Sequence, residues 1–241
     1  MLTTIQPFNH LFTIMNTNQN QKQLLDDIHA NIAGDYYDDS IANNPIKKVF
    51  HHYRFKNIGE MLNKSSQNLL DIGCAGGTFT NELSKHTDAK ITAIDISPQA
   101  IEYASRQYPH IDFQVHDAAE EYFPFPDNSF ETVTMLETLE HVLNPVEILQ
   151  DIKRVVKDDG EVIILVPSEN WHFRLGWEIW TRLPGNIGGA AWDESHVQRF
   201  DGHKLRHLME FIGYEILEER WFNLGLLVAV KARPKYPNIN Y

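Results

Sequence analysis

Residues 69–80 read LLDIGCAGGTFT, an apolar run that ends in a carboxylate and leads through a glycine turn into residues that favour a helix. Gly73 permits backbone angles that a side chain would forbid, and Gly76 and Gly77 let a ligand approach the amides at the start of the helix. Asp71, two residues before the first glycine, would repel a phosphate and attract a ligand that carries an ammonium and a sulfonium. The turn therefore indicates a pocket for a cationic nucleoside.

The composition is that of an ordinary globular protein, and we expect one catalytic domain with appendages. The 241 residues are 42% hydrophobic and 22% charged, which suffices for one substantial core. A net charge of -12 disfavours nucleic acid and anionic lipid as partners and favours a small, neutral or cationic acceptor. Cys74 is the single cysteine, so a disulfide framework and a zinc site of several cysteines are excluded.

The first 23 residues are interpreted as a flexible leader, because residues 16–23 consist largely of Asn and Gln. No Lys or Arg precedes Lys22, and no long apolar run follows it. We therefore expect neither a secretory signal nor a membrane span, and a cytoplasmic location.

Short strand-like runs alternate with helical patterns through the middle of the chain, which predicts an α/β fold with a parallel sheet covered by helices. The strands are expected at 68–74, 90–96, 111–117, 130–137 and 160–167, and the helices at 78–86, 98–107 and 146–157. Ser97-Pro98 is a helix cap followed by proline at the first helical position, and Asn144-Pro145 resembles it.

The end of the chain departs from that alternation. Two strands, at 214–221 and 226–232, are separated by four residues, too few for a crossover helix, so they must be antiparallel. A dinucleotide-binding sheet is typically all parallel. We expect a leader at 1–23, an N-terminal helical cap at 24–66, a cofactor-binding core at 67–168, an aromatic lid insertion at 169–200, and a C-terminal helix with antiparallel strands at 201–241 that completes the core.

Carboxylates close the second and third strands, where a ligand held over the glycine turn would lie. Asp95 could accept both hydroxyls of a ribose, and the alternative is a helix cap beside Ser97. Asp117 could accept an exocyclic amine while the amide of Ala118 meets a ring nitrogen. Asp117 and Ala118 together therefore predict recognition of an adenine.

Taken together, these motifs resemble those of the class I S-adenosylmethionine-dependent methyltransferases. The resemblance rests on Asp71-Ile72-Gly73, Asp95, Asp117-Ala118 and the segment FPDNSFE at 125–131, and it extends from residue 68 to 233. It implies a Rossmann-like fold, with a mostly parallel seven-stranded sheet, a C-terminal antiparallel hairpin and a helical lid, and S-adenosylmethionine as the methyl donor. Ala75 stands where many members carry glycine, and it should be tolerated if its backbone angles are ordinary.

The resemblance also implies which residues contact the donor. Asp71 and Gly73 would meet the methionine moiety directly or through water, Asp95 the ribose, and Ile96 the adenine ring. The expected donor-binding set is Asp71, Gly73, Cys74, Ala75, Gly76, Asp95, Ile96, Asp117, Ala118, Leu136 and Glu137.

The segment ETLEHV at 137–142 places two acidic side chains and an imidazole where a methyl acceptor should arrive. It resembles a stretch of the ubiquinone-pathway O-methyltransferases, in which such residues are associated with a divalent metal. Carried over, Glu137, Glu140 and His141 become candidate ligands of an ion such as magnesium. Similar sequences occur in relatives with no known metal, so the metal stays open.

Methyl transfer from a sulfonium needs alignment above all, and orientation can remove roughly 7 to 11 kcal/mol of a barrier. A hydroxyl acceptor must also lose a proton, which suits a histidine. His141, with Glu140 beside it, is the candidate base, and His196 is the alternative, unless His196 is structural. His203 and His207, one helical turn apart, indicate a helix face.

Aromatic residues suggest where the acceptor binds. Four of the five tryptophans lie at positions 171, 177, 180 and 192, on an expected amphipathic helix and its flanks. They could pack on the core, wall in an aromatic or isoprenoid acceptor, or dip into a membrane, which the net negative charge makes the weaker reading. The opposite wall could come from Tyr36, Tyr37, His51, His52, Tyr53 and Phe55.

These observations predict a methyltransferase that uses S-adenosylmethionine and methylates a small molecule, with oxygen as the accepting atom. A nicotinamide-dependent oxidoreductase is the alternative enzyme, because the glycine turn and Asp95 could serve either cofactor. Asp71, Asp117 and the antiparallel end argue against it. A non-catalytic protein that binds S-adenosylmethionine is the alternative of another class. The sequence leaves the acceptor and the oligomeric state open.

Overall fold

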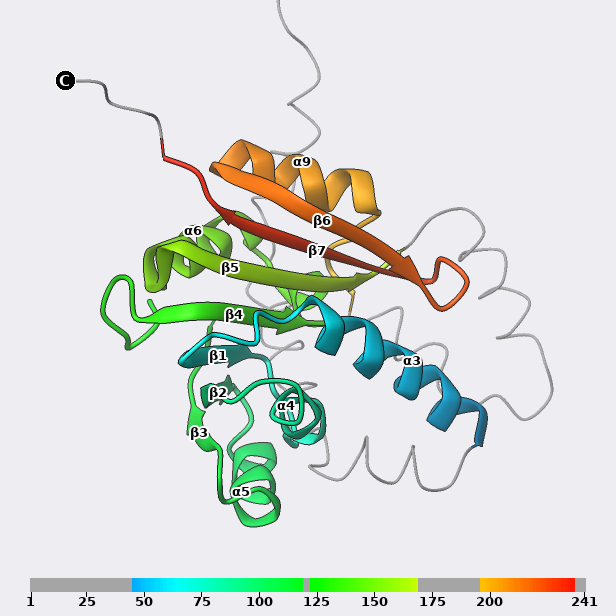
Figure 1. The fold of residues 1–241 in the computed structure, drawn as a ribbon, viewed down its shortest axis with the longest axis vertical. Helices are drawn as coiled ribbons and strands as arrows, with labels where there is room; N and C mark the ends of the chain where they lie inside the picture. The colour runs from blue at the N-terminus through cyan, green and yellow to red at the C-terminus, as the bar shows by residue number, and fades with distance from the viewer. Residues whose placement is uncertain (1–44, 119–121, 169–195, 237–241) are drawn as a thin grey trace, which may run out of the picture.

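The chain folds as a single seven-stranded sheet with helices on both faces (Figure 1). The computed structural model describes residues 45–118, 122–168 and 196–236. In chain order the elements are α3 (Pro45–Met61), β1 (Asn68–Ile72), α4 (Thr78–Leu83), β2 (Lys90–Asp95), α5 (Pro98–Gln107), β3 (Asp112–Val115), β4 (Phe130–Leu136), the short 3-10 helix η2 (Leu139–His141), α6 (Pro145–Val155), β5 (Val156–Pro167), α9 (Gly202–Ile212), β6 (Tyr214–Phe222) and β7 (Leu227–Pro234).

The strands lie in the order β3-β2-β1-β4-β5-β7-β6. The first five are parallel to their neighbours, whereas β7 is antiparallel to both β5 and β6. The predicted α/β fold with a mostly parallel sheet and a terminal antiparallel hairpin is therefore confirmed. Because β1 to β5 point the same way, their carboxyl ends meet at one edge of the sheet, on the right-hand side of Figure 1.

The boundary between α6 and β5 differs from the sequence prediction for a physical reason. The helix expected at 146–157 ends at Val155, and β5 begins directly at Val156 and not at Gly160. Val156 pairs with Phe130 across the sheet, so tertiary pairing outweighs the local helical pattern. Where the local signal is strong the prediction is confirmed, since α5 runs from Pro98 to Gln107 and the Ser97 side chain accepts a hydrogen bond from the Ala100 amide.

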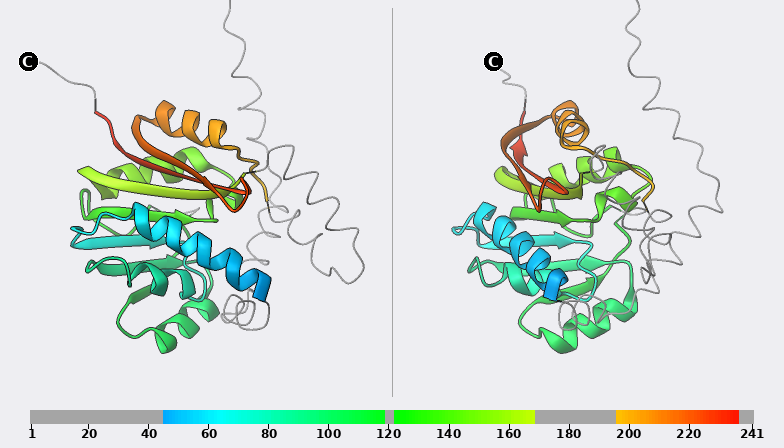
Figure 2. Two further views of the ribbon diagram at one scale, coloured as in Figure 1. Left: turned by 45° about the vertical axis from the view of Figure 1, so that its right-hand side comes forward. Right: turned by 90° about the vertical axis from the view of Figure 1, so that its right-hand side faces the viewer.

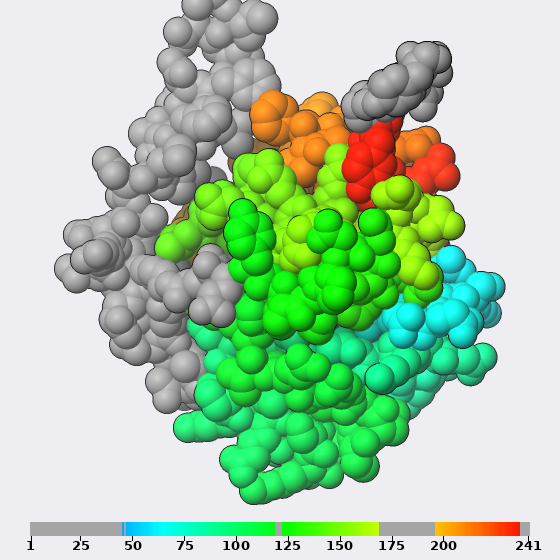
Figure 3. All heavy atoms as spheres, turned by 90° about the vertical axis from the view of Figure 1, so that its left-hand side faces the viewer, coloured from blue at the N-terminus to red at the C-terminus, as the bar shows by residue number. Residues whose placement is uncertain are grey.

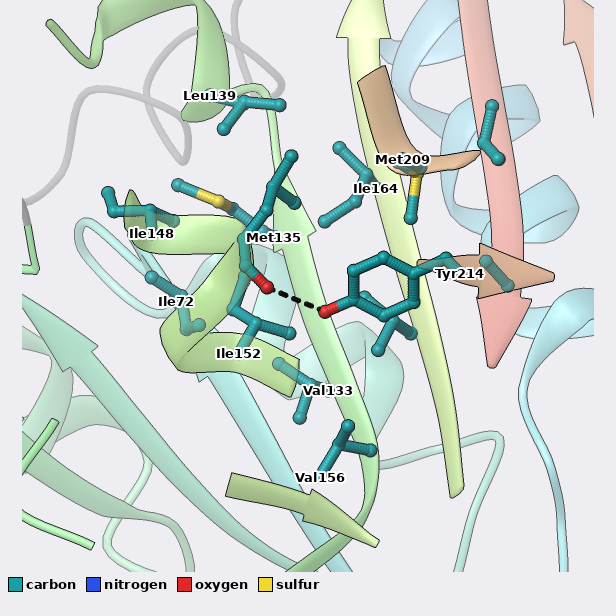
Figure 4. Close-up of a cluster of buried hydrophobic side chains, with 14 of the residues drawn as sticks. Ile72, Val133, Met135, Leu139, Ile148, Ile152, Val156, Ile164, Met209 and Tyr214 are labelled. Carbon is teal, nitrogen blue, oxygen red and sulfur yellow. Dashed lines mark hydrogen bonds between the residues drawn. The ribbon is translucent and has the colours of Figure 1, made fainter. Parts of the chain in front are cut away.

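Each face of the sheet packs against its own helices (Figure 2). Alternate strand residues such as Val133 and Met135 lie in one buried cluster with Ile152 of α6 and Met209 of α9 (Figure 4). The other face contacts α3, α4 and α5 through Ile58, Met61, Leu83 and Ile101. Among the described residues, no helix is long and apolar enough to cross a membrane.

The amino ends of the parallel strands form the opposite edge, which Figure 3 shows from outside. There the last strand, drawn in red, lies against the yellow-green residues of β5. Tyr214, the first residue of β6, is 2% exposed, and its hydroxyl donates to the carbonyl oxygen of Leu149 in α6 at 2.8 Å (Figure 4). This amino edge consists of packing contacts between strands and helices, whereas the candidate functional residues lie at the carboxyl edge.

Candidate active site

The glycine turn after β1 is held tightly between neighbouring strands. The amides of Gly73 and Cys74 both donate to the carbonyl oxygen of Ile94, at 2.8 and 3.1 Å. Gly73 has φ +77°, and an added Cβ would lie 2.2 Å from the Thr138 hydroxyl oxygen. Only glycine satisfies both conditions, so this turn touches the segment that follows β4.

Ala75 corrects one expectation. Its φ is +46°, which lies in the left-handed region, so its backbone angles are not ordinary. A left-handed residue with a Cβ is strained by roughly 1 to 2 kcal/mol. The Ala75 amide donates to the Asp95 carboxylate at 2.8 Å, and this bond helps to hold the strained turn. The neighbouring Cys74 is buried, and burial raises the pKa of its thiol.

Asp71 lies beneath the turn and is 2% exposed. Its two carboxylate oxygens accept hydrogen bonds from the Thr80 hydroxyl at 2.6 Å and the Thr134 hydroxyl at 2.7 Å. Burial raises its pKa to about 6, the threonine hydrogen bonds oppose that rise, and the nearby Asp95 charge adds to it. Near neutral pH the carboxylate is therefore mostly ionised, and it places a buried negative charge beneath the turn.

Asp95 closes β2 beside the glycine turn. One carboxylate oxygen accepts from the Ala75 amide, and the other accepts from the Ser97 amide at 2.9 Å. The carboxylate thus caps the segment before α5 and also faces the glycine turn, and its contact with a ribose stays a prediction. It stays half-buried at the carboxyl edge.

The residues expected around the adenine follow β2 and β3. Ile96 and Asp117 are half-buried, and Ala118 packs against the core beneath them. The amide of His116 donates to the Asp95 carbonyl oxygen at 2.9 Å, which places the end of β3 next to the end of β2. Asp95, at the end of β2, and Asp117, just after β3, therefore lie at the same edge of the sheet.

A buried ion pair lies at the end of β4. The Arg54 guanidinium from α3 contacts the Glu137 carboxylate, with side chains 3% and 18% exposed. The guanidinium also lies 4.5 Å from the centre of the Phe79 ring, in the first turn of α4. Glu137 has φ +54°, and its amide donates to the Leu165 carbonyl oxygen at 2.8 Å. A cation thus lies between the first turn of α4 and the end of β4.

Arg54 is not among the residues predicted from the sequence, although the sequence contains a signal for it. His51, Arg54, Ile58 and Met61 recur every three or four residues, and all four are buried on one face of α3. An arginine in such a buried stripe indicates an internal partner. The partner itself is 83 residues away in sequence, so the spacing within α3 could not name it.

The predicted catalytic residues Glu140, His141 and His196 come together in space. One ligand atom from each lies within 4.8 Å of the other two, and the two imidazole centres are 4.9 Å apart. Glu140 is 2% exposed and His196 is 9% exposed. Glu137 is not part of this cluster, because its carboxylate contacts Arg54. The ligand set implied by the ubiquinone-pathway resemblance is therefore not assembled as expected.

Comparison with known proteins then decides the family. A model described as "Methyltransferase domain" matches residues 47–219. The chain belongs to the methyltransferase domain family. This match covers all five parallel strands and most of β6, so it includes the glycine turn and the strand-end carboxylates.

This methyltransferase domain is similar to several known proteins. A ubiquinone biosynthesis O-methyltransferase of Coxiella burnetii is 25% identical over 146 residues, which cover 59% of this chain and 61% of the relative. The O-methyltransferase cnsE of Penicillium expansum is 34% identical over 104 residues, 41% of this chain and 37% of the relative. The chain thus spans under two thirds of the length of either relative. A solved S-adenosylmethionine-dependent methyltransferase of Aquifex aeolicus is 18% identical with a TM-score of 0.59, and the match covers 79% of this chain and 94% of that one. This last likeness confirms the Rossmann-like methyltransferase fold.

Some predicted features of the methyltransferase domain lie outside the described residues. They are the leader at 1–23, the part of the N-terminal cap before residue 45 with Tyr36 and Tyr37, and the lid up to residue 195 with Trp171, Trp177, Trp180 and Trp192. Of the aromatic residues on α3, His51 is buried, and Phe55 packs against Phe79 with the two ring centres 4.6 Å apart. His52 and Tyr53 are exposed.

Proposed function

We propose that this chain transfers a methyl group from S-adenosylmethionine to an oxygen atom of a small molecule. The observation that carries the proposal is the Asp95 carboxylate, which closes β2 and accepts the amide of Ala75 in the glycine turn. A donor lying over this turn would meet, in order, the ends of β1, β2 and β3. The family match over residues 47–219 supports the same donor.

Each part of the donor has a candidate partner. The ribose hydroxyls face Asp95, and the adenine lies by Ile96, Asp117 and Ala118. The methionine part lies over Gly73, Cys74, Ala75 and Gly76, toward Leu136 and Glu137. The ammonium and sulfonium of the donor are attracted by the ionised Asp71 below the turn. The Arg54 guanidinium is a candidate partner for the carboxylate of the donor's methionine part.

The acceptor reaches the donor from the side of η2. The sulfonium methyl group moves to an acceptor oxygen, and the sulfur keeps the electron pair of the broken bond. Alignment of oxygen, methyl carbon and sulfur lowers the barrier most. A hydroxyl acceptor also gives up its proton, and we assign that step to the cluster of Glu140, His141 and His196. The names of the two relatives, both O-methyltransferases, support oxygen as the accepting atom.

The acceptor class is proposed from the sequence alone. The tryptophans between residues 171 and 192 favour an aromatic or lipophilic molecule, and the net charge of -12 disfavours nucleic acid. Contact of this segment with a membrane is the less favoured proposal, for the same electrostatic reason. We also propose that the protein is cytoplasmic.

Calorimetric titration with S-adenosylhomocysteine tests donor binding. Asp95→Ala should weaken binding by roughly ten- to hundredfold, because charge-assisted hydrogen bonds are worth roughly 1.5 to 3 kcal/mol. Asp112→Ala, which removes an exposed aspartate of β3, is the matched control and should leave the affinity unchanged. Since Asp95 also caps two amides, Asp95→Asn shows how much of the loss is local folding.

The same titration separates the competing functions. Binding of NAD without binding of S-adenosylhomocysteine would establish the oxidoreductase alternative. Binding of S-adenosylhomocysteine with no methylated product from a broad panel of phenols, alcohols and amines would favour a non-catalytic binding protein. Unchanged affinity in Asp95→Ala would remove Asp95 from the pocket.

A further inference from the structure

The strongest feature that the methyl donor does not use is the Glu140, His141 and His196 cluster. Three potential ligand atoms, two imidazole nitrogens and one carboxylate oxygen, lie within 4.8 Å of one another. Two ligands of one small ion lie at most about 4.4 Å apart, because each is roughly 2.0 to 2.2 Å from the metal, so a small closing movement would suffice. The three side chains are therefore close to a coordinating arrangement.

The backbone fixes this convergence. The amides of Val197 and Gln198 both donate to the Glu140 carbonyl oxygen, at 3.0 and 2.9 Å. The Gln198 side-chain amide donates to the Leu143 carbonyl oxygen at 3.2 Å. These three hydrogen bonds hold residues 196–198 against η2, although the two segments are more than fifty residues apart. His196 is thus brought to His141 by a defined backbone contact.

The composition of the cluster differs from the oxygen-rich set that the sequence resemblance implies. That set contains Glu137, Glu140 and His141, but Glu137 has the buried Arg54 guanidinium as its partner. A cation at Glu137 would have to compete with this guanidinium for the same carboxylate. The structure exchanges one carboxylate of the implied set for the imidazole of His196.

This exchange changes the kind of ion that fits. Magnesium and calcium prefer oxygen ligands, and magnesium usually keeps several waters. Imidazole suits zinc, cobalt, iron and nickel, and two histidines with one carboxylate form a common site that leaves positions open. A set of two nitrogens and one oxygen therefore selects a late first-row transition metal over magnesium.

We propose that Glu140, His141 and His196 bind one divalent transition-metal ion, with zinc and cobalt as suitable probes. The ion's role rests on the proposed function, whereas its binding does not. An ion here would draw electron density from an acceptor hydroxyl and favour the loss of its proton. The two imidazoles would then act as ligands and not as bases. The cluster adjoins the donor turn, because Thr138, two residues before Glu140, lies against Gly73.

Metal titration of tag-free, chelator-treated protein tests the proposal. Wild-type protein should bind one Zn²⁺ or Co²⁺ per chain in calorimetry, and Co²⁺ should give visible d–d absorption that reports its nitrogen ligands. Mg²⁺ should bind at least about tenfold more weakly than Zn²⁺. Glu140→Gln and His196→Gln should each weaken Zn²⁺ binding by more than about tenfold, since even residues behind metal ligands are worth about that much.

Two variants serve as matched controls. Glu137→Gln removes the neighbouring carboxylate outside the cluster, and His207→Gln removes an exposed histidine of α9. His207→Gln should retain wild-type Zn²⁺ affinity, and so should Glu137→Gln when it is titrated well below its unfolding temperature, because loss of the Arg54 partner is expected to lower its stability. The cluster variants and His207→Gln are titrated with S-adenosylhomocysteine in parallel, and retained binding shows that the core is folded. If a cluster variant loses S-adenosylhomocysteine binding, its unfolding temperature is measured with and without Zn²⁺ instead. Zn²⁺ should raise the unfolding temperature of wild type and leave that of the variant unchanged.

The outcomes separate this inference from the proposed function. Wild-type Zn²⁺ affinity in His196→Gln, or Mg²⁺ binding as tight as that of Zn²⁺, would overturn the proposed ligand set. A loss in Glu137→Gln equal to that in Glu140→Gln would establish the oxygen-rich set in its place. If the protein binds S-adenosylhomocysteine but does not bind Zn²⁺, only the metal site is contradicted. If it binds Zn²⁺ but does not bind S-adenosylhomocysteine, only the proposed methyl donor is contradicted.

Discussion

Ala75 carries strain at the residue where the donor's methionine part is proposed to lie. Its φ of +46° costs an alanine roughly 1 to 2 kcal/mol, whereas glycine adopts such angles freely. The surrounding hydrogen bonds, including that from the Ala75 amide to Asp95, keep the turn in place. Strain of this kind is often found at functional sites, where the fold as a whole offsets it.

We predict that Ala75→Gly stabilises the protein by up to about 1 kcal/mol, because the relief of strain exceeds the extra entropy of an unfolded glycine. Urea unfolding measures the change. Ala89→Gly is the control, since Ala89 is also half-buried but has no positive φ. It should lose about 0.5 to 1 kcal/mol. Equal losses in both variants would show that Ala75 is unstrained.

Asp71 makes stability depend on pH, because burial raises its pKa from 3.8 to about 6. Below pH 3.8 the carboxyl is protonated in both states, so it is buried without a charge. As the pH rises toward about 6, Asp71 loses its proton in the unfolded chain before it does so in the folded protein. The contribution of the neutral carboxyl to the free energy of unfolding is then lost. The difference between these pKa values corresponds to roughly 3 kcal/mol.

Asp71→Asn should remove this dependence. Relative to wild type, the variant should gain roughly 3 kcal/mol in unfolding free energy between pH 4 and pH 7. Urea unfolding of both proteins across that range gives the difference directly. Asp112→Asn, at an exposed position of β3, should follow wild type throughout. A constant difference between Asp71→Asn and wild type would mean that the native pKa is ordinary.

At the scale of elements, the Arg54–Glu137 pair joins α3 to the end of β4. Removal of one member leaves a buried charge without its partner, which costs about 3 to 5 kcal/mol. We predict that Arg54→Met and Glu137→Gln are each strongly destabilising, and that the double variant loses clearly less than the sum. A double-mutant cycle in urea measures this coupling.

The exposed pair of Glu102 and Arg106 on α5 supplies the control cycle, because its side chains are 63% and 73% exposed. Its coupling should stay below about 1 kcal/mol. Additive losses in the Arg54 and Glu137 cycle would show that the contact does not hold the two elements together.

Elements whose signals are local were predictable from the sequence. The apolar run, carboxylate and glycines of residues 69–77 adjoin one another, and Ser97-Pro98 marks the start of α5. Contacts between distant segments were not predictable. Arg54 and Glu137 are 83 residues apart, and Glu140 and Val197 are also distant in sequence, so only the folded sheet brings each pair together. The left-handed angles of Ala75 were missed for a related reason, because tertiary hydrogen bonds impose them on a residue that prefers others.

At the scale of the whole molecule, the two edges of the sheet have different tasks. The carboxyl edge carries the glycine turn, the strand-end carboxylates and the Glu140 cluster, where strain and buried charge lower stability. The amino edge carries contacts such as the hydrogen bond from the Tyr214 hydroxyl to Leu149, which ties the terminal hairpin to α6 (Figure 4). Stability and donor binding should therefore respond to different substitutions.

Tyr214→Phe tests this separation, because it removes one buried hydrogen bond and keeps the ring. The unfolding free energy should fall by about 1 kcal/mol, the usual net value of such a bond. The affinity for S-adenosylhomocysteine should not change, because Tyr214 pairs with Pro234 at the amino edge, whereas β7 reaches the carboxyl edge at Leu227. Tyr122→Phe, at a side chain that is 82% exposed, should change neither quantity. A loss of donor affinity in Tyr214→Phe would mean that the two edges are coupled through the sheet, and that the hairpin helps to position the glycine turn.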